Sequence, residues 1–239
     1  MQQPAGFQHS DKTLVCKLHK VIYGLKQPPR QWFERLKGSL LQFEFYSCRC
    51  DNSLFIRTSS DFQLYVLVYV DDIIVTGSSP SMVSKVIKDL STTFSLNQLG
   101  KLDYFLGIEV KHISDGTLLM SQIKYISNLL TRANMDTTKP MPSPMASNCK
   151  LSQEGNDLFE DPTFYRSIVG ALQYATVTRS DIAFSVNKVC QILGKPLQSH
   201  WTVVKRILKY LQGTVCFGLN IGKAHNHTPL ALSPFCDVG

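Results

Sequence analysis

The amino-acid sequence predicts an α+β fold, in which an antiparallel sheet with helices on one face precedes a mostly helical second half. Two apolar runs, 64–70 and 73–75, are rich in β-branched and aromatic residues and flank the pair Asp71-Asp72. Runs of this length and composition are typical of strands, so the pair predicts the tip of a tight β-hairpin. Helical periodicity dominates from residue 163 onward.

Two helices and a further strand are predicted around this hairpin. A proline pair at 28–29 suits the first turn of a helix, and Ser79-Pro80 suits an N-cap followed by the first helical position. The first helix is predicted to turn inward Trp32, Phe33, Leu36, Leu40, Leu41 and Phe43. The second is predicted to turn inward Val83, Val86, Ile87, Leu90 and Phe94. Segments 54–57 and 62–70 predict paired strands on either side of a polar turn.

The second half is predicted to begin with another hairpin and to continue as helices. Strands over 104–111 and 117–120 would meet at Asp115-Gly116, and Ser121 would cap the helix that follows. That helix carries Tyr125, Ile126, Leu129 and Leu130 on its apolar side. Prolines 140, 142 and 144 predict a stiff extended linker. The remaining predicted elements are helices over 163–177, 181–194 and 198–212, a strand over 215–221 and a polar linker over 222–228.

Composition excludes several classes of protein. A chain of 239 residues, 44% of them hydrophobic, can bury a substantial core in one or two domains. Its formal net charge of +7 suits a polyanionic partner without requiring one. The seven cysteines are odd in number and scattered, which argues against a secreted disulfide framework. No apolar run approaches the roughly 20 residues that cross a bilayer, and no signal peptide is visible, so we expect cytoplasmic or nuclear residence and no membrane partner.

The pair Asp71-Asp72 is the chief candidate for a chemical site. Two unit charges roughly 4 Å apart repel by about 1 kcal/mol even in water. A hard divalent cation such as Mg²⁺ relieves that repulsion, because it prefers oxygen ligands and needs few dedicated protein groups. A turn required only for geometry would more often contain Asn-Gly or Asp-Gly. A polar hairpin tip without chemical function is the alternative interpretation.

Five blocks of the sequence carry a family pattern. They are 18–32 (LHKVIYGLKQPPRQW), 69–72 (YVDD), 99–110 (LGKLDYFLGIEV), 165–174 (YRSIVGALQY) and 204–211 (VKRILKYL). In this order they resemble the reverse transcriptase of copia-type retrotransposons, an RNA-directed DNA polymerase that is part of a Pol polyprotein. The resemblance covers nearly the whole chain. YVDD alone is a weak signal, whereas five blocks in the right order are a specific one.

The resemblance implies a reverse-transcriptase palm followed by a thumb and a mostly helical connection region. Residues 1–115 would form a partial palm, 116–146 a thumb-like segment with the proline-rich linker, 147–225 the connection region, and 226–239 the start of a ribonuclease H-like domain whose first metal-binding acid is Asp237. A further catalytic aspartate of the family precedes the YGLKQ block. Asp11, the only acid there, lies in a polar loop and is not assigned this role. We therefore expect an internal piece of a polyprotein that lacks the first catalytic strand and the fingers.

The resemblance also implies roles for single residues. Asp71 and Asp72 would be the catalytic residues and would bind two Mg²⁺ or Mn²⁺ ions, with Asp71 the stronger ligand. The nucleotide pocket would include Tyr23, Gly24 and Lys26. Nucleic acid would be contacted by Arg30, Tyr69, Leu106, Gly107, Lys205 and Arg206, of which Leu106 and Gly107 lie in a block that resembles the primer grip.

Each of these roles has a structural alternative. The YGLK block can be a glycine turn before a helix, the block 105–108 can be a core strand with one glycine, and the basic residues can belong to a solvated helix face. One position departs from the family pattern: members often have lysine at the position of Asn97, and asparagine cannot protonate or screen a leaving group. His200, His225 and His227 lack partners at metal-ligand spacing, so they are interpreted as structural or solvated.

The implied parent reaction is the Mg²⁺-dependent addition of deoxynucleoside triphosphates to a primer on an RNA or DNA template. This chain alone is expected to be inactive, because it lacks the upstream aspartate. One alternative is a non-catalytic nucleic-acid-binding or relict transposon-derived protein that keeps the fold. Another is an unrelated metal-dependent phosphohydrolase, which would need further acids or histidines in a pocket, and the sequence has no suitable cluster.

Overall fold

The computed structural model describes residues 6, 8–11, 13–14, 28–147, 149, 151–152 and 155–222. The chain divides between Leu99 and Gly100 into two compact units. Within the described residues, each unit has its own antiparallel sheet and its own hydrophobic cluster. This confirms a mixed fold of helices and antiparallel sheets. The predicted nucleotide-pocket residues Tyr23, Gly24 and Lys26, and the segment that carries His225, His227 and Asp237, lie outside the described residues.

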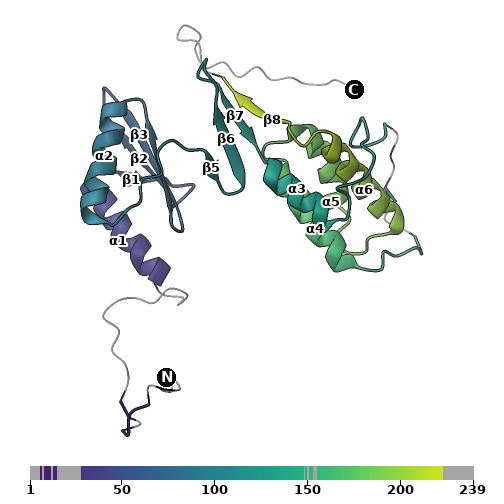
Figure 1. The fold of residues 1–239 in the computed structure, drawn as a ribbon, viewed down its shortest axis with the longest axis horizontal. Helices are drawn as coiled ribbons and strands as arrows, with labels where there is room; N and C mark the ends of the chain where they lie inside the picture. Colours follow the sequence, from purple (N-terminus) through teal and green to yellow (C-terminus); the bar gives the residue numbers. More distant parts are fainter. Residues whose placement is uncertain are drawn as a thin grey trace. The chain divides into compact units, whose positions relative to one another are not determined.

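The first unit is a four-stranded sheet with two helices on one face (Figure 1). Its elements are α1 (Pro28–Gln42), β1 (Tyr46–Ser47), β2 (Leu54–Thr58), β3 (Gln63–Tyr69), β4 (Asp72–Gly77) and α2 (Pro80–Thr93). The strands lie in chain order, and every neighbouring pair is antiparallel. The helices and strands predicted for this part of the chain are therefore confirmed, apart from shifts of a few residues at their ends.

Strand β3 shows why helices cover only one face of this sheet. Leu64, Val66 and Val68 alternate along the strand and are buried, whereas Tyr65 and Leu67 on the opposite face are half-buried. The cluster that the buried residues join includes Leu36 and Leu40 of α1, Phe55 of β2, and Val86 and Leu90 of α2. Both helices therefore pack on the same face, and the opposite face of the sheet is left uncovered by them.

One detail predicted for these helices is wrong, and another is confirmed. Leu41 does not face inward: it is 49% exposed, because each residue of an α-helix is rotated by about 100° from the one before and Leu40 takes the buried direction. Ser79 does hold the N-cap position of α2, but its hydroxyl makes no bond to the helix backbone. It lies 3.0 Å from the Ser81 hydroxyl instead.

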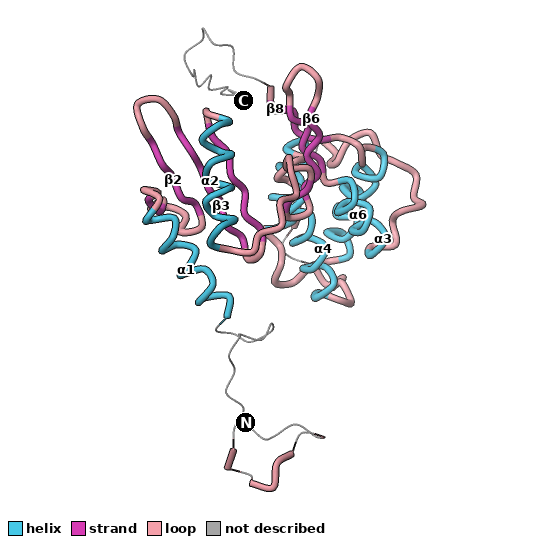
Figure 2. Tube along the Cα trace, turned by 60° about the vertical axis from the view of Figure 1, so that its left-hand side comes forward, coloured by secondary structure: helices cyan, strands magenta, loops and turns pink. Residues whose placement is uncertain are grey.

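The second unit combines a small sheet with a group of helices (Figures 1 and 2). Its elements are β5 (Tyr104–Phe105), β6 (Ile108–His112), β7 (Leu118–Ser121), α3 (Ile123–Arg132), α4 (Pro162–Ala175), the 3₁₀ turn η1 (Ser180–Ile182), α5 (Ala183–Cys190), α6 (Gln198–Gly213) and β8 (Gly218–Ile221). The last strand, β8, pairs antiparallel with β7, so segments about a hundred residues apart lie side by side in one sheet. The three predicted helices of the carboxy-terminal half are confirmed.

The helices of this unit share one apolar core. Tyr165 of α4 is fully buried, and its hydroxyl donates to the Val189 carbonyl oxygen of α5 over 3.3 Å. Burial raises the pKa of Tyr165 to about 12. His200 of α6 is also fully buried: Nδ1 accepts from the Leu197 N–H (2.9 Å), so Nε2 donates to the Ser152 carbonyl oxygen (2.8 Å). The interpretation of His200 as a structural residue is confirmed.

The predicted strand 104–111 is wrong, because the chain turns at Leu106-Gly107. Phe105 pairs with Ile108, so β5 and β6 form a hairpin of their own. The predicted cap of α3 is also wrong: Ser121 ends β7, and Gln122 occupies the N-cap.

The proline-rich segment does not behave as a free linker, because it packs along α6. The Met141 N–H donates to the Lys209 carbonyl oxygen (3.3 Å), and the Ser143 hydroxyl accepts from the Arg206 guanidinium (2.9 Å). The predicted strand 215–221 is shorter than expected and begins at Gly218.

Two further findings concern composition. In the part of the chain that the structure describes, no helix is both long and apolar enough to span a membrane. The cysteines found there, Cys48, Cys50, Cys149, Cys190 and Cys216, are free thiols.

Candidate functional site

The Asp-Asp pair lies at the tip of the β3–β4 hairpin. Tyr69 and Asp72 face each other as the last pair of the ladder, so the loop consists of Val70 and Asp71 alone. Asp71 is therefore the second loop residue and Asp72 the first residue of β4, and both are exposed. The predicted tight hairpin with carboxylates at its tip is confirmed.

The register of this hairpin decides which face of the sheet Asp72 occupies. Paired residues point to the same face, and so do residues two apart on one strand. Tyr69 and Asp72 therefore share a face with Leu67 and its partner Ile74. This is the face opposite to the buried Leu64-Val66-Val68 side, so Asp72 stands on the face that α1 and α2 leave uncovered.

Val70 gives the loop an unusual backbone. Its φ is +50°, in the left-handed region, where an L-residue other than glycine pays roughly 1–2 kcal/mol. A β-branched residue is a rare occupant of this region, and the Val70 side chain is 60% exposed. Burial in the core therefore does not explain why valine is there. Strain of this kind gathers at functional sites, which makes the loop a candidate for one.

The two carboxylates are the right type of ligand for a hard cation, but two are too few for a two-metal site. Among the described residues, neither forms a hydrogen bond or ion pair with another side chain, so their oxygens are available as ligands. Carboxylate oxygens are what Mg²⁺ prefers. A two-metal site needs several bridging acids, however, and no group of three or more His, Cys, Asp or Glu side chains in the described part is placed to hold a metal.

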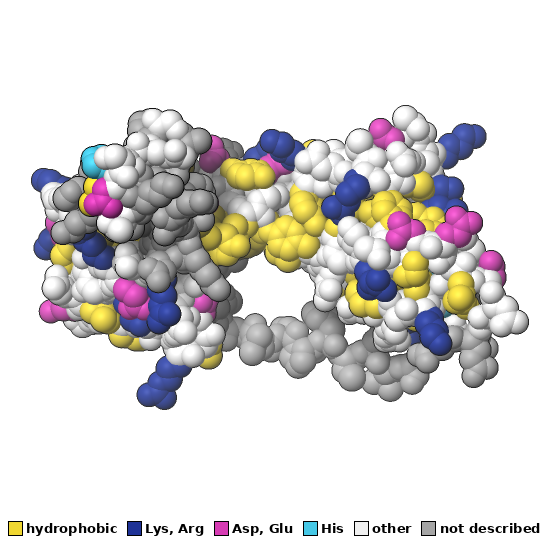
Figure 3. All heavy atoms as spheres, turned by 90° about the horizontal axis from the view of Figure 1, so that it is seen from below, with side chains coloured by type: hydrophobic (Ala, Val, Ile, Leu, Met, Phe, Trp, Pro, Cys, Tyr) yellow, Lys and Arg dark blue, Asp and Glu magenta, His cyan; other side chains and the backbone are white. Residues whose placement is uncertain are grey.

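Two other sequence candidates belong to the first unit. Arg30 is exposed in the first turn of α1, and Asn97 is exposed in the segment after α2. On the face drawn in Figure 3, lysine and arginine side chains are spread among acidic, polar and apolar ones. The net positive charge is thus not gathered in one patch on that face.

The second candidate hairpin, β5–β6, also turns through a strained loop. Its loop residues Leu106 and Gly107 both have positive φ, +50° and +81°, as a type I′ turn requires. Glycine suits that backbone, and leucine does not. The block 105–108 is therefore a hairpin turn, and its alternative interpretation as a core strand is wrong.

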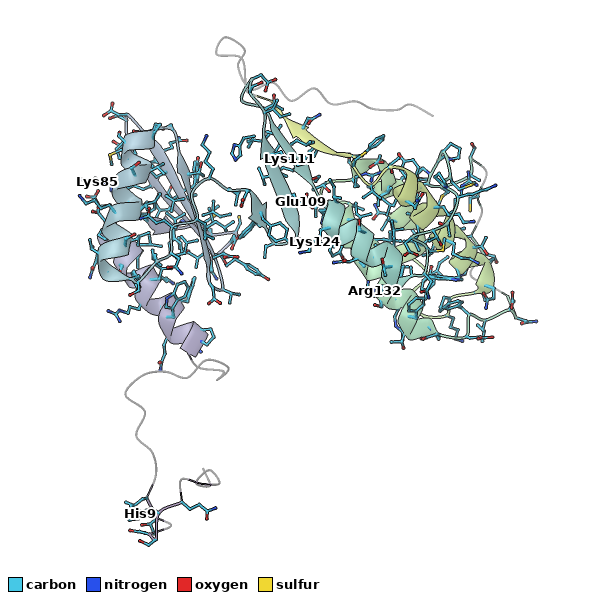
Figure 4. The ribbon with its side chains drawn as sticks, in the orientation of Figure 1. His9, Lys85, Glu109, Lys111, Lys124 and Arg132 are labelled. Carbon is cyan, nitrogen blue, oxygen red and sulfur yellow. The ribbon has the colours of Figure 1, made fainter. Side chains whose placement is uncertain are left out.

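Sequence reasoning missed the residues that hold this turn. The Tyr174 hydroxyl of α4 donates to the Leu106 carbonyl oxygen, and the Tyr125 ring meets the Tyr174 ring edge-on with centroids 5.0 Å apart. On β6, the Glu109 carboxylate accepts from the Lys124 N–H at the start of α3 (3.0 Å), and Figure 4 shows these two residues side by side. The only signal in the sequence was that Tyr174 ends the YRSIVGALQY block.

Of the basic residues on α6, Lys205 and Arg206 are half-buried rather than fully exposed. Arg206 donates to Ser143, so part of its guanidinium is used within the unit. The opposite side of α6 is buried as predicted, with Val204, Ile207, Leu208 and Leu211 in the core.

An ion pair in the second unit also escaped prediction. Arg179 is 1% exposed and donates to both Asp181 carboxylate oxygens, over 2.9 and 2.7 Å. It also donates to the carbonyl and hydroxyl oxygens of Thr214, and the Tyr210 hydroxyl donates to Asp181. Burial would raise the pKa of Asp181, but hydrogen bonds from Arg179 and Tyr210 and the charge of Arg179 outweigh it and lower that pKa. Tyr210 and Thr214 lie 29 and 35 positions from their partners Asp181 and Arg179, so no local pattern links the four residues.

The candidates thus fall into two groups. The first unit holds Arg30, Tyr69, Asp71 and Asp72, and the second holds Leu106, Gly107, Lys205 and Arg206. Among the residues of the first unit that the structure describes, the β3–β4 hairpin is where predicted residues lie together.

Comparison with known proteins agrees with this set of motifs. A family model described as reverse transcriptase (RNA-dependent DNA polymerase) matches residues 1–147. Over all 239 residues the chain is 43% identical to the retrovirus-related Pol polyprotein from transposon RE1 of Arabidopsis thaliana, and covers 16% of that protein. It is 39% identical over 236 residues to the Pol polyprotein from transposon TNT 1-94 of Nicotiana tabacum, covering 91% of this chain and 18% of that protein.

A shorter relative matches as well. The putative transposon Ty5-1 protein of Saccharomyces cerevisiae is 32% identical over 240 residues, which is all of this chain and 77% of that protein. The chain thus spans less than a fifth of the two Pol polyproteins. No solved structure matches.

Proposed function

This chain belongs to the reverse transcriptase family of copia-type transposon Pol polyproteins, and from that membership we propose that its first unit is part of a polymerase palm. The observation that carries the proposal is the β3–β4 hairpin. It presents Asp71 at its tip and Asp72 on the face of the sheet that α1 and α2 leave uncovered, which is where a duplex would lie in this proposal. In this proposal residues 100–115 of the second unit also belong to the partial palm, and the rest of that unit supplies the thumb-like segment and the connection region.

In the parent protein, Asp71 and Asp72 would hold divalent cations, Mg²⁺ or Mn²⁺. When bound, such ions lower the pKa of a primer hydroxyl and neutralise the charge of a triphosphate. The chain itself positions the two carboxylates. The ladder pair Tyr69–Asp72 fixes the carboxylate of Asp72 relative to the sheet, and the tight two-residue loop holds Asp71 beside it.

The substrates in this proposal are a primer on an RNA or DNA template and deoxynucleoside triphosphates. Tyr23, Gly24 and Lys26 would serve the nucleotide, and Arg30, Tyr69, Lys205 and Arg206 would contact nucleic acid. Phosphate contacts position a duplex without reading its sequence, so binding should show little sequence preference.

We expect the chain on its own to bind nucleic acid without polymerising. Its two candidate ligands come from one hairpin and cannot bridge two ions, and among the described residues no third acid joins them. Each 1.36 kcal/mol added to a barrier slows a reaction about tenfold, so a site that lacks one metal ligand should react many times more slowly. The incomplete set of metal ligands among the described residues also fits a second candidate function, that of a non-catalytic nucleic-acid-binding protein that keeps the fold.

The metal proposal is tested by Mn²⁺ paramagnetic broadening in NMR spectra of the full chain. Broadening should centre on residues 69–73 and disappear in Asp71→Asn/Asp72→Asn. Asp61→Asn is the matched control, since Asp61 is an exposed acid in the neighbouring β2–β3 turn and should leave the broadening unchanged. Broadening that persists in the double variant would show that the hairpin is not the metal site.

Nucleic-acid binding and catalysis are tested with one primer–template. Affinity should fall with salt, with a log–log slope of about −0.9 per phosphate neutralised on B-form DNA. Absence of binding at low salt would reject both candidate functions. No primer extension is expected of the chain by itself. Extension by the chain alone, abolished in Asp71→Asn, would contradict the need for a further acid.

A further inference from the structure

The β5–β6 hairpin has little of its own to hold its turn in place. Strand β5 has two residues, and the ladder that closes the turn consists of Tyr104–Glu109 and Phe105–Ile108. So short a hairpin is marginal without packing against other elements. Its loop begins with Leu106 in the left-handed region, 39% exposed, where asparagine would be the unstrained choice.

Two tyrosines from the helices lie directly behind this loop. The Tyr174 hydroxyl donates to the Leu106 carbonyl oxygen, the one backbone acceptor between the two strained loop residues. A β-carbon placed on Gly107 would lie 3.8 Å from the Tyr174 ring and 3.9 Å from the Tyr125 ring, so both rings lie on the side of the loop toward which a Gly107 side chain would point. The loop is therefore supported by residues of α3 and α4 as well as by its own short strands.

The support is itself fixed. The Tyr125 hydroxyl donates to the Ala171 carbonyl oxygen of α4 (3.1 Å), and its ring meets Tyr174 edge-on, which ties the two aromatic side chains together. Burial raises the pKa of Tyr125, so the hydroxyl keeps its proton for this bond at neutral pH. A second contact holds the hairpin to α3: the carboxylate of Glu109, the second residue of β6, accepts a hydrogen bond from the Lys124 N–H.

We propose that Tyr174, backed by Tyr125, is a positioning residue that holds the Leu106-Gly107 turn in its strained form for contact with the recessed 3′ end of a primer. The inference rests on the proposed function, in which this turn belongs to the block that resembles the primer grip. The proposal explains the strain. The primer end requires this loop shape, and the Tyr174 hydroxyl stabilises the loop in that shape. Tyr174 itself does not contact the nucleic acid.

The test compares two tyrosines of the same helix in the full chain. Tyr174→Phe and Tyr165→Phe each remove one hydroxyl that donates to a backbone carbonyl oxygen, the first under the turn and the second inside the core. The first readout is amide hydrogen exchange over residues 104–109. It should become about fivefold faster in Tyr174→Phe, as loss of one hydrogen bond predicts, and stay unchanged in Tyr165→Phe. Unchanged exchange in Tyr174→Phe would overturn the proposal.

The second readout is the ratio of affinities for a duplex with a recessed 3′ end and a blunt duplex of equal length. Tyr174→Phe should reduce this ratio about fivefold while blunt-duplex affinity stays the same, and Tyr165→Phe should leave the ratio unchanged. Faster exchange with an unchanged ratio would overturn the role at the primer end and leave the proposed function standing. Failure of the unmodified chain to bind either duplex would refute the proposed function, and the positioning role with it.

Discussion

At the scale of single residues, both candidate hairpins place a bulky apolar side chain where the backbone disfavours it. Val70 and Leu106 each occupy the first loop position with φ near +50°, and each is substantially exposed. Stability does not account for this choice, because an asparagine in either place would relieve strain without emptying the core. The shared feature fits the proposal that both loops are shaped for contact with nucleic acid.

We expect Val70→Asn to stabilise the first unit. Asparagine tolerates the left-handed region, so the free energy of unfolding should rise by about 1 kcal/mol. The measurement is urea unfolding in a Trp201→Phe background, where the fluorescence of Trp32 reports on the first unit alone. Thr76→Asn is the control: Thr76 is exposed on regular β4, and asparagine there should be neutral or destabilising. An equal gain at both positions would show that strain at Val70 is not the cause.

At the scale of elements, the Arg179 ion pair joins the end of α4 to the end of α6. Arg179 and Asp181 belong to the connection that leads from α4 into η1, and Tyr210 and Thr214 belong to the last turn of α6 and its C-cap. After the C-cap of α6 the chain enters β8, the edge strand that pairs with β7. The ion pair therefore holds Thr214, which lies shortly before the last strand of the small sheet. A buried guanidinium without its carboxylate would be costly, so Asp181 is the more sensitive partner.

We expect Asp181→Asn to destabilise the second unit by roughly 2 kcal/mol at neutral pH, a figure reduced because Asp181 is about one-third exposed. The pKa of Asp181 in the folded protein lies below its ordinary value of 3.8. Its stabilising effect is therefore present above pH 3.8 and is lost as the pH falls through the lower, folded-state value. The difference between wild type and variant should shrink over that acid range.

Urea unfolding followed by Trp201 fluorescence in a Trp32→Phe background measures this effect at each pH. Asp136→Asn, which alters an exposed acid of the same unit, should show no such pH-dependent difference. A gap between wild type and Asp181→Asn that stays constant below pH 3.8 would refute the assigned role of the carboxylate.

At the scale of the whole molecule, the two hydrophobic clusters have no residue in common. One draws its buried residues from positions 36–94 and the other from 126–211. Each cluster also contains one of the two tryptophans, Trp32 in the first and Trp201 in the second. The stability of each unit can therefore be followed separately.

We expect Leu64→Ala to destabilise the first unit and leave the second unchanged. Leu64 is fully buried in β3, and truncating a buried leucine costs about 3 kcal/mol. The Trp32 transition should shift to lower urea and the Trp201 transition should stay in place. Leu41→Ala, at an exposed leucine of the same unit, should move neither. Equal shifts of both transitions in Leu64→Ala would mean that the two units unfold as one.

The sequence by itself predicted most helices, the antiparallel strands, the Asp71-Asp72 hairpin and the family, because periodicity, turn residues and motifs are local signals. Two predictions from local signals were wrong by one position. Ser121 is the last residue of a strand and not a helix cap, and Leu41 lies just beside the buried side of its helix. Each error is a shift of one residue, which corresponds to about 100° of rotation on a helix. Hydrophobic periodicity does not locate a boundary or a buried side to within one residue.

Other features were decided by the tertiary structure alone, because they depend on contacts between residues far apart in the chain. The pairing of β8 with β7, the packing of the proline-rich segment on α6, and the bond from Tyr174 to Leu106 across 68 positions have no signature within a short window. The positive φ of Val70 also stems from a two-residue loop whose length the ladder register sets. Residue types thus determined which chemistry the chain offers, and long-range packing decided where that chemistry is held.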